Sequence, residues 1–403
     1  MVGRGPGGGG VTARLEALLA GLPDPTTARN GGKVFTRRYT TVDTGAAVTL
    51  VCADRRVLWL TDRLAGHAYT VAGPGPGWRV QLDVVDERIL APLAWAFAGA
   101  PVRATDPDIA IRHLHTGRWD AFSADRDRTL ILADPDQGVV RVLTTDSTAG
   151  HRWGPQLVRQ AMTAQLRAAG AVHAHAAAVV VSGIGVLIAG LRASGKTTTV
   201  LAALRLLAAD LVADHRVLLA RDPDTSRGGG LVGYPWPAPV TVRSGALLGH
   251  PQLRTLLGAP DPRAQMTGHS VTVDPAQNAV LLAGGRLRAR VRPRLMLWPQ
   301  LALDRSPHTA PGPPIARGEV RARLTRTRLF LIDPGRGPNE PTDDWLTDPT
   351  PPTEAGRMGQ AFRTVVEDLA AVDCHRLYVT PDPVGIARQI TALLPTAPLR
   401  AVS

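Results

Sequence analysis

Cysteine, lysine and aromatic residues are scarce in this 403-residue sequence. The two cysteines, Cys52 and Cys374, lie far apart and form no CxxC pair, which fits a reducing compartment and argues against a cysteine metal site. Aromatic residues make up 4% of the chain and offer few surfaces on which nucleic-acid bases could stack. The formal charge of +12 comes from scattered arginines without a nucleic-acid-binding motif, so we do not expect a nucleic-acid partner.

Long apolar runs are absent as well. No uninterrupted apolar run approaches the roughly 20 residues that cross a bilayer, and the glycine-rich start lacks the apolar core of a signal peptide. An apolar content of 44% beside 20% charged residues is typical of a globular protein, and the length allows two domains. We therefore expect a cytoplasmic protein with no membrane partner.

Turn signals and apolar patterns divide the chain into three parts, with an α/β fold overall. Residues 1–34 predict a flexible tail, residues 35–150 a β-rich N-terminal domain, and residues 151–403 a domain that closes with a strand and a helix. Strands are predicted at 46–52, 57–61, 78–84, 129–133, 139–144, 186–189, 211–214, 216–220, 240–243 and 375–379. Helices are predicted at 87–98, 156–169, 198–209, 360–371 and 386–394. The proline-dense residues 233–239 predict an ordered loop or an edge segment, and Pro293 and Pro299 predict turns.

Two histidines of the N-terminal domain, His113 and His115, alternate as they would on one face of a strand. A pair of imidazoles can bind a metal, but no third ligand stands nearby in the sequence. We interpret them as an ordinary surface pair.

The residues from Gly190 to Thr197, GLRASGKT, fit the phosphate-loop pattern G-x-x-x-x-G-K-[ST]. Glycines allow backbone conformations in which successive N–H groups turn toward a phosphate, and the following helix directs its positive dipole end there. The lysine supplies a mobile charge for the terminal phosphates, and the threonine hydroxyl can bind Mg²⁺. The predicted nucleotide-binding residues are Gly190, Arg192, Ala193, Ser194, Gly195, Lys196, Thr197 and Thr198.

The context of this loop supports nucleotide binding. The apolar residues 186–189 before it predict a strand, and the alanine- and leucine-rich residues 198–209 after it predict a helix. Only two of the 46 lysine and arginine residues are lysines, Lys33 and Lys196, and one of them stands at the loop position. There a compact ammonium differs chemically from a guanidinium. We conclude that the sequence predicts a nucleoside-triphosphate site.

Two further residues extend the predicted site. Asp214 ends the apolar run LVAD, and a carboxylate at the end of a strand beside a phosphate loop commonly holds Mg²⁺ or lies near the reacting phosphate. Arg243, which ends a predicted strand, could reach a phosphate. The predicted metal ligands are therefore Thr197 and Asp214.

From His175 onward the sequence reads His175, AAAVVVSGIGVLIA, GLRASGKT, helix and LVADHRV. This order of a histidine, about fourteen residues, a phosphate loop, a helix and an apolar run that ends in acidic residues resembles the catalytic domain of HPr kinase/phosphorylase and its kinase-like relatives. The resemblance covers residues 171–250, and some of these relatives accompany the biosynthesis of ribosomally made peptides. The later GYPWPAPVTVRSGALL resembles the family's proline-rich segment, with Arg243 at its basic position.

The resemblance implies a fold shared with phosphoenolpyruvate carboxykinase and transfer of the γ-phosphate of ATP to a serine hydroxyl of a protein or peptide. It implies that Lys196 and Thr197 hold phosphates and metal, that His175 lies by the transferred phosphate, and that Asp214 belongs to an acidic pair. It also allows a homo-oligomer. The predicted cofactors are ATP and Mg²⁺, and the predicted catalytic residues are Asp214, His215 and His175.

The sequence departs from the family pattern at two usually acidic positions, which hold His215 and Thr241. Three interpretations follow: His215 serves as the base, Asp214 performs both tasks, or the site binds nucleotide without transferring phosphate. A kinase is the leading hypothesis, and a nucleotide-binding scaffold or regulator is the alternative. A transport ATPase is disfavoured because the sequence has no LSGGQ-like motif and no apolar strand that ends in Asp-Glu.

Overall fold

The computed structural model describes residues 13, 17 and 33–394, apart from gaps at 95–96, 98, 107–108, 117, 192, 223–229, 260–269, 274–280, 303–309, 327–331, 334–336, 339–345 and 347–351. The predicted tail at 1–34 therefore lies almost entirely outside the described residues. The architecture is mixed α/β with several sheets. The chain divides into unit 1 (Met1–Ala168 with Glu340–Pro351) and unit 2 (Ala169–Asn339 with Pro352–Ser403).

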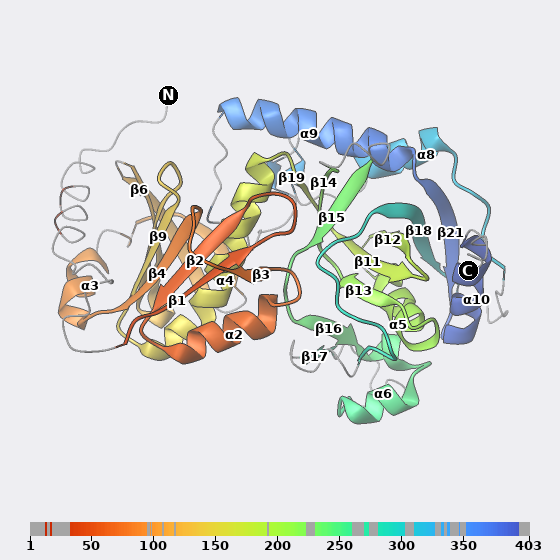
Figure 1. The fold of residues 1–403 in the computed structure, drawn as a ribbon, viewed down its shortest axis with the longest axis horizontal. Coiled ribbons are helices and arrows are strands. Elements are labelled where there is room, and N and C mark those ends of the chain that lie inside the picture. Colours follow the sequence, from red (N-terminus) through yellow and green to blue (C-terminus); the bar gives the residue numbers. More distant parts are fainter. Residues whose placement is uncertain are drawn as a thin grey trace. The chain divides into compact units, whose positions relative to one another are not determined.

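Unit 1 is organised around a nine-stranded sheet (Figure 1). Its strands are β1 (Phe35–Thr40), β2 (Ala47–Cys52), β3 (Thr70–Ala72), β4 (Trp78–Val84), β5 (Val102–Asp106), β6 (Ile109–Thr116), β7 (Trp119–Ala124), β8 (Thr129–Asp134) and β9 (Val139–Thr144). They lie in the order β3-β1-β2-β4-β9-β8-β7-β6-β5. β2, β4 and β9 are parallel, and β5 to β9 form an antiparallel meander. Four of the five strands predicted in this region are confirmed, as β2, β4, β8 and β9.

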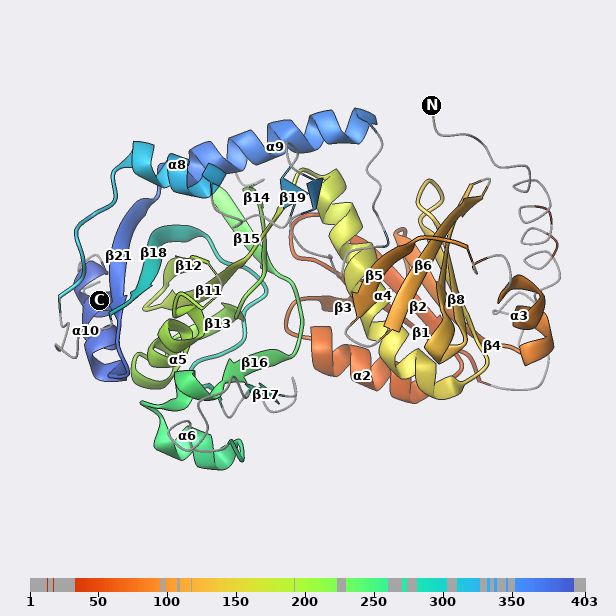
Figure 2. The same cartoon turned by 180° about the vertical axis from the view of Figure 1, so that it is seen from behind.

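Helices α2 (Arg55–Ala65) and α4 (Ser147–Ala168) pack against each other, and α4 packs on the central strands of the sheet (Figure 2). Gly154 allows the two helices to touch, because a Cβ there would lie 2.4 Å from Cγ1 of Val57. The short helix α3 (Glu87–Ala94) and the 3₁₀ turn η2 (Asp125–Asp127) complete the described elements of this unit. Since α4 packs on this sheet, the two units divide after Ala168 rather than after residue 150.

The strand predicted at residues 57–61 is wrong, because these residues belong to α2. The apolar run VLWL is compatible with either structure, and two features favour the helix. Asp54 caps the helix by accepting a hydrogen bond from Arg56 N, and the buried Val57, Thr61 and Ala65 recur at the four-residue spacing of one helix face.

Unit 2 centres on a five-stranded sheet and a smaller antiparallel sheet. The larger sheet has the order β13-β11-β12-β18-β21, where β12, β18 and β21 are parallel and β11 is antiparallel to both β12 and β13. Its strands are β11 (Ala176–Val181), β12 (Ile184–Ala189), β13 (Asp210–Ala213), β18 (Pro293–Leu301) and β21 (Asp373–Val379). The smaller sheet pairs β14 (Val217–Arg221) with β10 (Val172–Ala174) and β15 (Leu231–Pro235). Two ribbons pair β16 (Val240–Arg243) with β17 (Ser270–Val273) and β19 (Ile332–Asp333) with β20 (Gly337–Pro338).

Both faces of the five-stranded sheet are buried, and its residues alternate between two cores. Val186 and Ile188 of β12 enter a core with α5 (Lys196–Leu206) and α10 (Pro383–Leu393). Leu187 and Ala189 enter the opposite core. That core includes α8 (Arg317–Arg326) and α9 (Pro352–Ala370). The 3₁₀ turn η4 (Ser244–Leu247) and helix α6 (Pro251–Leu256) join the α5 side. None of the described helices is long and apolar enough to cross a membrane.

Of the proline-based predictions in this unit, the structure confirms one and corrects the other. Residues 233–235 form the end of β15, an edge strand of its sheet, where Pro235 pairs as the last residue, which confirms the predicted edge segment. Pro293 and Pro299 lie within β18 instead of marking turns. Pro293 is the first residue of that strand, and Pro299 lies beyond the part that pairs with β12, so neither removes an interior hydrogen bond to that strand.

Candidate functional site

The glycine-rich segment joins the end of β12 to the start of α5, so strand, loop and helix follow one another as predicted. Gly195 has a left-handed φ of 104°, and a Cβ there would lie 2.9 Å from Cγ1 of Val379. Ala193 is also left-handed, with a φ of 64°. Left-handed residues of this kind allow backbone N–H groups to curve around an anion. The local backbone therefore suits a phosphate.

Lys196, the first residue of α5, is 7% exposed, and its side chain is hydrogen-bonded to the backbone of the loop. Its Nζ donates hydrogen bonds to the carbonyl oxygen of Gly190 at 2.8 Å and to that of Leu191 at 2.9 Å. The Ser194 side chain lies against the first loop position, where a Cβ on Gly190 would lie 2.6 Å from Oγ of Ser194. That Oγ is itself buried without a hydrogen-bond partner. The loop thus contains a buried ammonium and a buried hydroxyl that has no hydrogen-bond partner.

Strand register brings two distant residues to the same edge of the sheet as this loop. β11 and β12 pair with Ala176 opposite Ala189, so His175, just before β11, and Gly190, just after β12, lie at the same edge of the sheet. β13 is antiparallel to β11 and ends at Ala213, so the chain leaves the sheet at Asp214 on the side where β11 begins. The end of one strand, the start of another and the loop therefore meet at one edge.

Asp214 and His215 form a hydrogen-bonded pair at this edge. The distance from Oδ1 of Asp214 to Nδ1 of His215 is 2.7 Å, and their side chains are 10% and 32% exposed. The His175 ring lies edge-on to the His215 ring, with 6.4 Å between the ring centres. Because Asp214 engages Nδ1, Nε2 is the nitrogen through which His215 can exchange a proton with another group. The three predicted catalytic residues are thus brought together.

His175 is neutral at physiological pH. Burial lowers its pKa to about 3, and the positive charge of Lys196 contributes next, with smaller effects of His215 and Arg216. A neutral imidazole acts through hydrogen bonds rather than through its charge.

The remaining predicted residues fall into three groups. Thr197 and Thr198 lie in the first turn of α5 and are partly buried. Arg192 lies outside the described residues. Arg243 is exposed at the end of β16, before the turn η4 that packs on α5. Within the described part of the chain, no hydrogen bond or ion pair joins Arg243 to the loop, so the structure does not assemble it with the other residues.

Arg216 is a site residue that sequence reasoning missed. Its guanidinium carbon lies 4.5 Å from the centre of the Trp236 ring, and its charge helps to lower the pKa of His175. Trp236 also contacts the ring of His173, with 5.4 Å between ring centres. The available signal was a positive charge directly after Asp214 and His215, but arginine is so common in this chain that the position did not stand out.

The oxygen atoms of Thr197 and Asp214 suit Mg²⁺ better than a transition metal. In the parts of the chain that the structure describes, no group of three or more His, Cys, Asp or Glu side chains could hold a metal ion. Mg²⁺ is commonly bound through one or two carboxylates together with substrate phosphates and water. One hydroxyl and one carboxylate therefore fit a nucleotide-bound Mg²⁺ and not a metal centre made by the protein alone.

Comparison with known proteins identifies no family. No protein-family model and no curated protein matches the sequence. The function must therefore be inferred from the geometry of the site and from the residue order at 171–250.

Proposed function

We propose that this protein is a kinase that uses ATP and Mg²⁺ to phosphorylate a serine-type hydroxyl of a peptide or protein. The observation that supports this proposal is the register of β11, β12 and β13. It brings His175, Gly190 and Asp214 to the same edge of the sheet. A phosphate loop, a carboxylate and two imidazoles at one edge provide the charges and proton acceptors that phosphoryl transfer needs.

The loop residues would bind and orient the nucleotide. Lys196 would exchange its hydrogen bonds with the carbonyl oxygens of Gly190 and Leu191 for contacts to the terminal phosphates. Thr197 and Asp214 would hold Mg²⁺, which when bound neutralises phosphate charge. Since phosphoryl transfer has little covalent chemistry for the protein to perform, this positioning and charge neutralisation supply most of the catalysis.

The Asp214–His215 pair would take the proton of the acceptor. The hydroxyl oxygen forms a bond to the γ-phosphorus while the bond from that phosphorus to the ADP oxygen breaks. The hydroxyl proton passes to the carboxylate of Asp214 or to Nε2 of His215, and the hydrogen bond of 2.7 Å between the two side chains makes them a single acceptor unit. Neutral His175 would donate a hydrogen bond beside the transferred group.

A transfer assay tests this proposal. The full chain is incubated with γ-labelled ATP, Mg²⁺ and candidate peptides encoded near its gene. The expected result is label on a serine or threonine of one peptide. Label that stays on ATP, or that appears only as inorganic phosphate, contradicts the proposal.

The alternative function is a nucleotide-binding scaffold or regulator that accompanies a biosynthetic enzyme. One observation favours it: His215 and Thr241 stand where the resembling kinases carry acids, which leaves Asp214 as the carboxylate of the predicted set. Tight ATP binding without transfer to any candidate peptide would establish this alternative.

We place the protein in the cytoplasm, where ATP is available and where the buried Cys52 and Cys374 would remain reduced. A homo-oligomer is also part of the proposal, and light scattering of the purified chain measures it directly.

A further inference from the structure

Helix α2 leaves one aromatic side chain, that of Trp59, in contact with solvent. Trp59 is 48% exposed, and no other aromatic residue is among the large apolar residues that are exposed in the described part of the chain. The helix packs against α4 through its other face, whose buried residues are Val57, Leu58, Thr61 and Ala65. The exposed part of the indole therefore contributes nothing to the core of unit 1.

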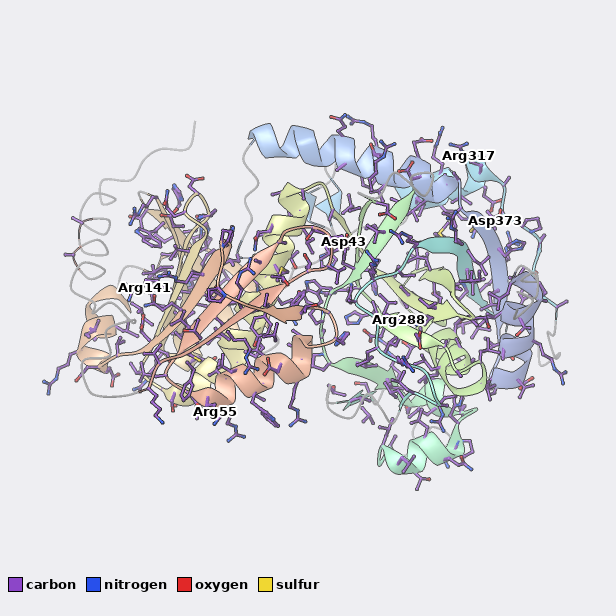
Figure 3. The ribbon with its side chains drawn as sticks, in the orientation of Figure 1. Asp43, Arg55, Arg141, Arg288, Arg317 and Asp373 are labelled. Carbon is purple, nitrogen blue, oxygen red and sulfur yellow. The ribbon has the colours of Figure 1, made fainter. Side chains whose placement is uncertain are left out.

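Three arginines surround this tryptophan on the helix surface. Arg55, Arg56 and Arg63 lie four residues before, three before and four after it, and side chains at these spacings are neighbours on a helix. The guanidinium carbon of Arg63 lies 4.1 Å from the centre of the Trp59 ring. Figure 3 labels Arg55 below α2, on the side away from the strands. These four residues are here called the α2 outer face.

The guanidinium groups of Arg55 and Arg56 are available to a partner. Both residues are exposed, and neither guanidinium forms a hydrogen bond or an ion pair with a described residue. They also occupy the first turn of α2, where the helix dipole is positive and acidic residues are favoured. This unfavourable placement does nothing for the helix itself, and a negative group supplied from outside would offset it.

The carboxylate of Asp62 does not neutralise this face. Asp62 follows Trp59 by three residues and is the one acidic residue of α2. Its carboxylate pairs with Arg37 and accepts a hydrogen bond from the Tyr39 hydroxyl at 2.9 Å. Because Arg37 and Tyr39 belong to β1, this carboxylate is engaged by the sheet. The α2 outer face thus contains three positive charges and no acid.

The carboxylate of Asp54, just before the helix, is engaged as well. One of its oxygens accepts a hydrogen bond from Arg56 N at 2.8 Å, which caps the helix. The other lies 2.6 Å from Nε2 of His151 in α4. Asp54 therefore lies near Arg56 without forming an ion pair with its guanidinium.

We propose that the α2 outer face binds an acidic segment of a partner protein or peptide that carries an apolar side chain. The carboxylates of this segment pair with Arg55 and Arg56, and its apolar side chain covers the exposed part of Trp59. Tryptophan and arginine are enriched among the residues that dominate the binding energy of protein interfaces. The inference is independent of the proposed kinase function.

A membrane surface and a nucleic acid fit this face less well. An amphipathic helix binds a bilayer by burying a broad apolar face, and the apolar face of α2 is already packed inside unit 1. Single strands stack their bases on open aromatic rings, whereas the guanidinium of Arg63 lies over the Trp59 ring. Both are tested beside the peptide.

Binding of model peptides to the full chain tests the inference without ATP. The probe is a fluorescein-labelled ten-residue peptide of glutamates with two central leucines. One control peptide carries Gln in place of Glu, and another carries Ser in place of Leu. Fluorescence anisotropy should show that the probe binds about tenfold more tightly than the Gln peptide and about fivefold more tightly than the Ser peptide. Added salt should weaken binding of the probe.

Variants of the α2 outer face locate the binding. Arg55→Gln should weaken binding of the probe about threefold, and Arg55→Gln with Arg56→Gln about tenfold. Because these changes remove positive charge from the first turn, they should not lower the urea midpoint of unfolding, so weaker binding would not reflect loss of the fold. Trp59→Ala should weaken binding of the probe about fivefold and that of the Ser peptide less than twofold, since the Ser peptide offers the indole no apolar partner.

An exposed arginine of another helix provides the matched control. Arg388 in α10 is exposed and forms no hydrogen bond or ion pair with a described residue. It follows the 46% exposed Val384 by four residues, as Arg63 follows Trp59, but no other arginine lies within α10. Arg388→Gln should therefore change binding of the probe less than twofold.

The inference is overturned if the probe binds no more tightly than the Gln peptide, or if the variants of Arg55 and Arg56 bind it as wild type does. It is also overturned if Arg388→Gln weakens binding as much as Arg55→Gln. Tighter binding to a ten-nucleotide single strand, or to vesicles of phosphatidylserine and phosphatidylcholine in equal parts, overturns it too when that binding depends on Arg55 and Arg56. Since none of these measurements involves phosphate transfer, the kinase and this docking surface can fail separately.

Discussion

Each unit contains an aspartate that contacts histidine, and the two clusters differ in where the backbone places them. In unit 1, Oδ1 of Asp120 lies 2.9 Å from Nε2 of His113 and 3.1 Å from Nδ1 of His115. These residues face one another across the regular antiparallel pair β6–β7. In unit 2, Asp214, His215 and His175 lie outside regular strands, beside a loop with a buried ammonium.

This difference indicates that position in the fold, and not residue type, distinguishes a structural cluster from a candidate site. Cross-strand neighbours satisfy the unit 1 cluster, in which His113 is 12% exposed and stacks on Phe122. Strand ends project side chains beyond the sheet, where a ligand can meet them. His115, at 67% exposure, fits the predicted surface pair, whereas His113 is more buried than that prediction implies.

The largest expected effect is on phosphate transfer, where replacing Lys196 and replacing Lys33 should give different results. Lys196→Ala removes the ammonium of the loop and should lower phosphate transfer about a thousandfold, the scale of losing one charge-stabilising group in an active site. The exposed Lys33 provides the control, and Lys33→Ala should transfer label as wild type does. Equal transfer activity of the two variants would show that the loop lysine takes no part in phosphate transfer.

Replacing one histidine in each cluster sharpens the comparison. His215→Gln should reduce transfer about a hundredfold, because a proton acceptor contributes on this scale. His113→Gln should leave transfer unchanged and reduce the free energy of unfolding by about 1 kcal/mol through the lost hydrogen bond to Asp120. Rates of label transfer and urea unfolding of both variants measure the two effects. A loss of phosphate transfer in His113→Gln would contradict the claim that only the unit 2 cluster takes part in transfer.

The loop backbone should be sensitive to a side chain at Gly195. Gly195→Ala places a Cβ at a φ of 104° and 2.9 Å from Val379, so the backbone or its neighbour must shift. We expect a loss of about 1–3 kcal/mol in the free energy of unfolding together with weaker ATP binding. Gly183→Ala is the control: its φ is also positive, at 82°, but a Cβ there would meet nothing within 4 Å. If the control loses ATP binding as strongly, the close contact at Gly195 is not the cause.

The dependence of stability on pH should also distinguish the two clusters, because their key groups titrate in different pH ranges. The pKa of His175 is about 3 in the folded chain, against an ordinary histidine value of 6.5. Protonation therefore favours the unfolded state as pH falls from 6.5 toward 3, and His175→Gln should lose less stability than wild type across this range.

For Asp120, burial alone would raise the pKa, but hydrogen bonds from His113 and His115 lower it overall. A lowered pKa means that its stabilisation is present above the unfolded value of about 3.9 and is lost as pH falls below it. Asp120→Asn should consequently flatten the stability profile only below about pH 4. Urea unfolding between pH 3 and pH 7 measures both profiles, and identical profiles for the two variants would contradict these assignments.

The phosphate loop was predictable because its chemistry is local: glycines, lysine and threonine at fixed spacing between a strand and a helix. The meeting of His175 with Asp214 was expected only from the resemblance, since register between β11, β12 and β13 is a tertiary property. The strand predicted at 57–61 failed for a related reason, because a short apolar run is ambiguous until its packing against α4 is known.

Arg216 and Arg243 illustrate two opposite errors of prediction in an arginine-rich sequence: one functional arginine was missed, and one predicted arginine is not joined to the site. Arg243 was predicted from its place at a strand end and from the resemblance, yet its side chain is exposed and makes no hydrogen bond or ion pair with a described residue. Arg216 was passed over, although its charge acts on His175. Composition hides single functional arginines, and only their neighbours in the fold distinguish them.

The central claim is that the sheet edge with Lys196, Asp214 and His215 transfers phosphate rather than only binding nucleotide. ATP binding and label transfer from γ-labelled ATP, measured together on wild type and Asp214→Asn, test it most directly. Wild type should bind ATP and label a candidate peptide, and Asp214→Asn should still bind ATP within a few fold while its transfer falls about a hundredfold. Wild type that binds ATP but labels no peptide, or an Asp214→Asn variant that transfers as fast as wild type, would contradict the claim.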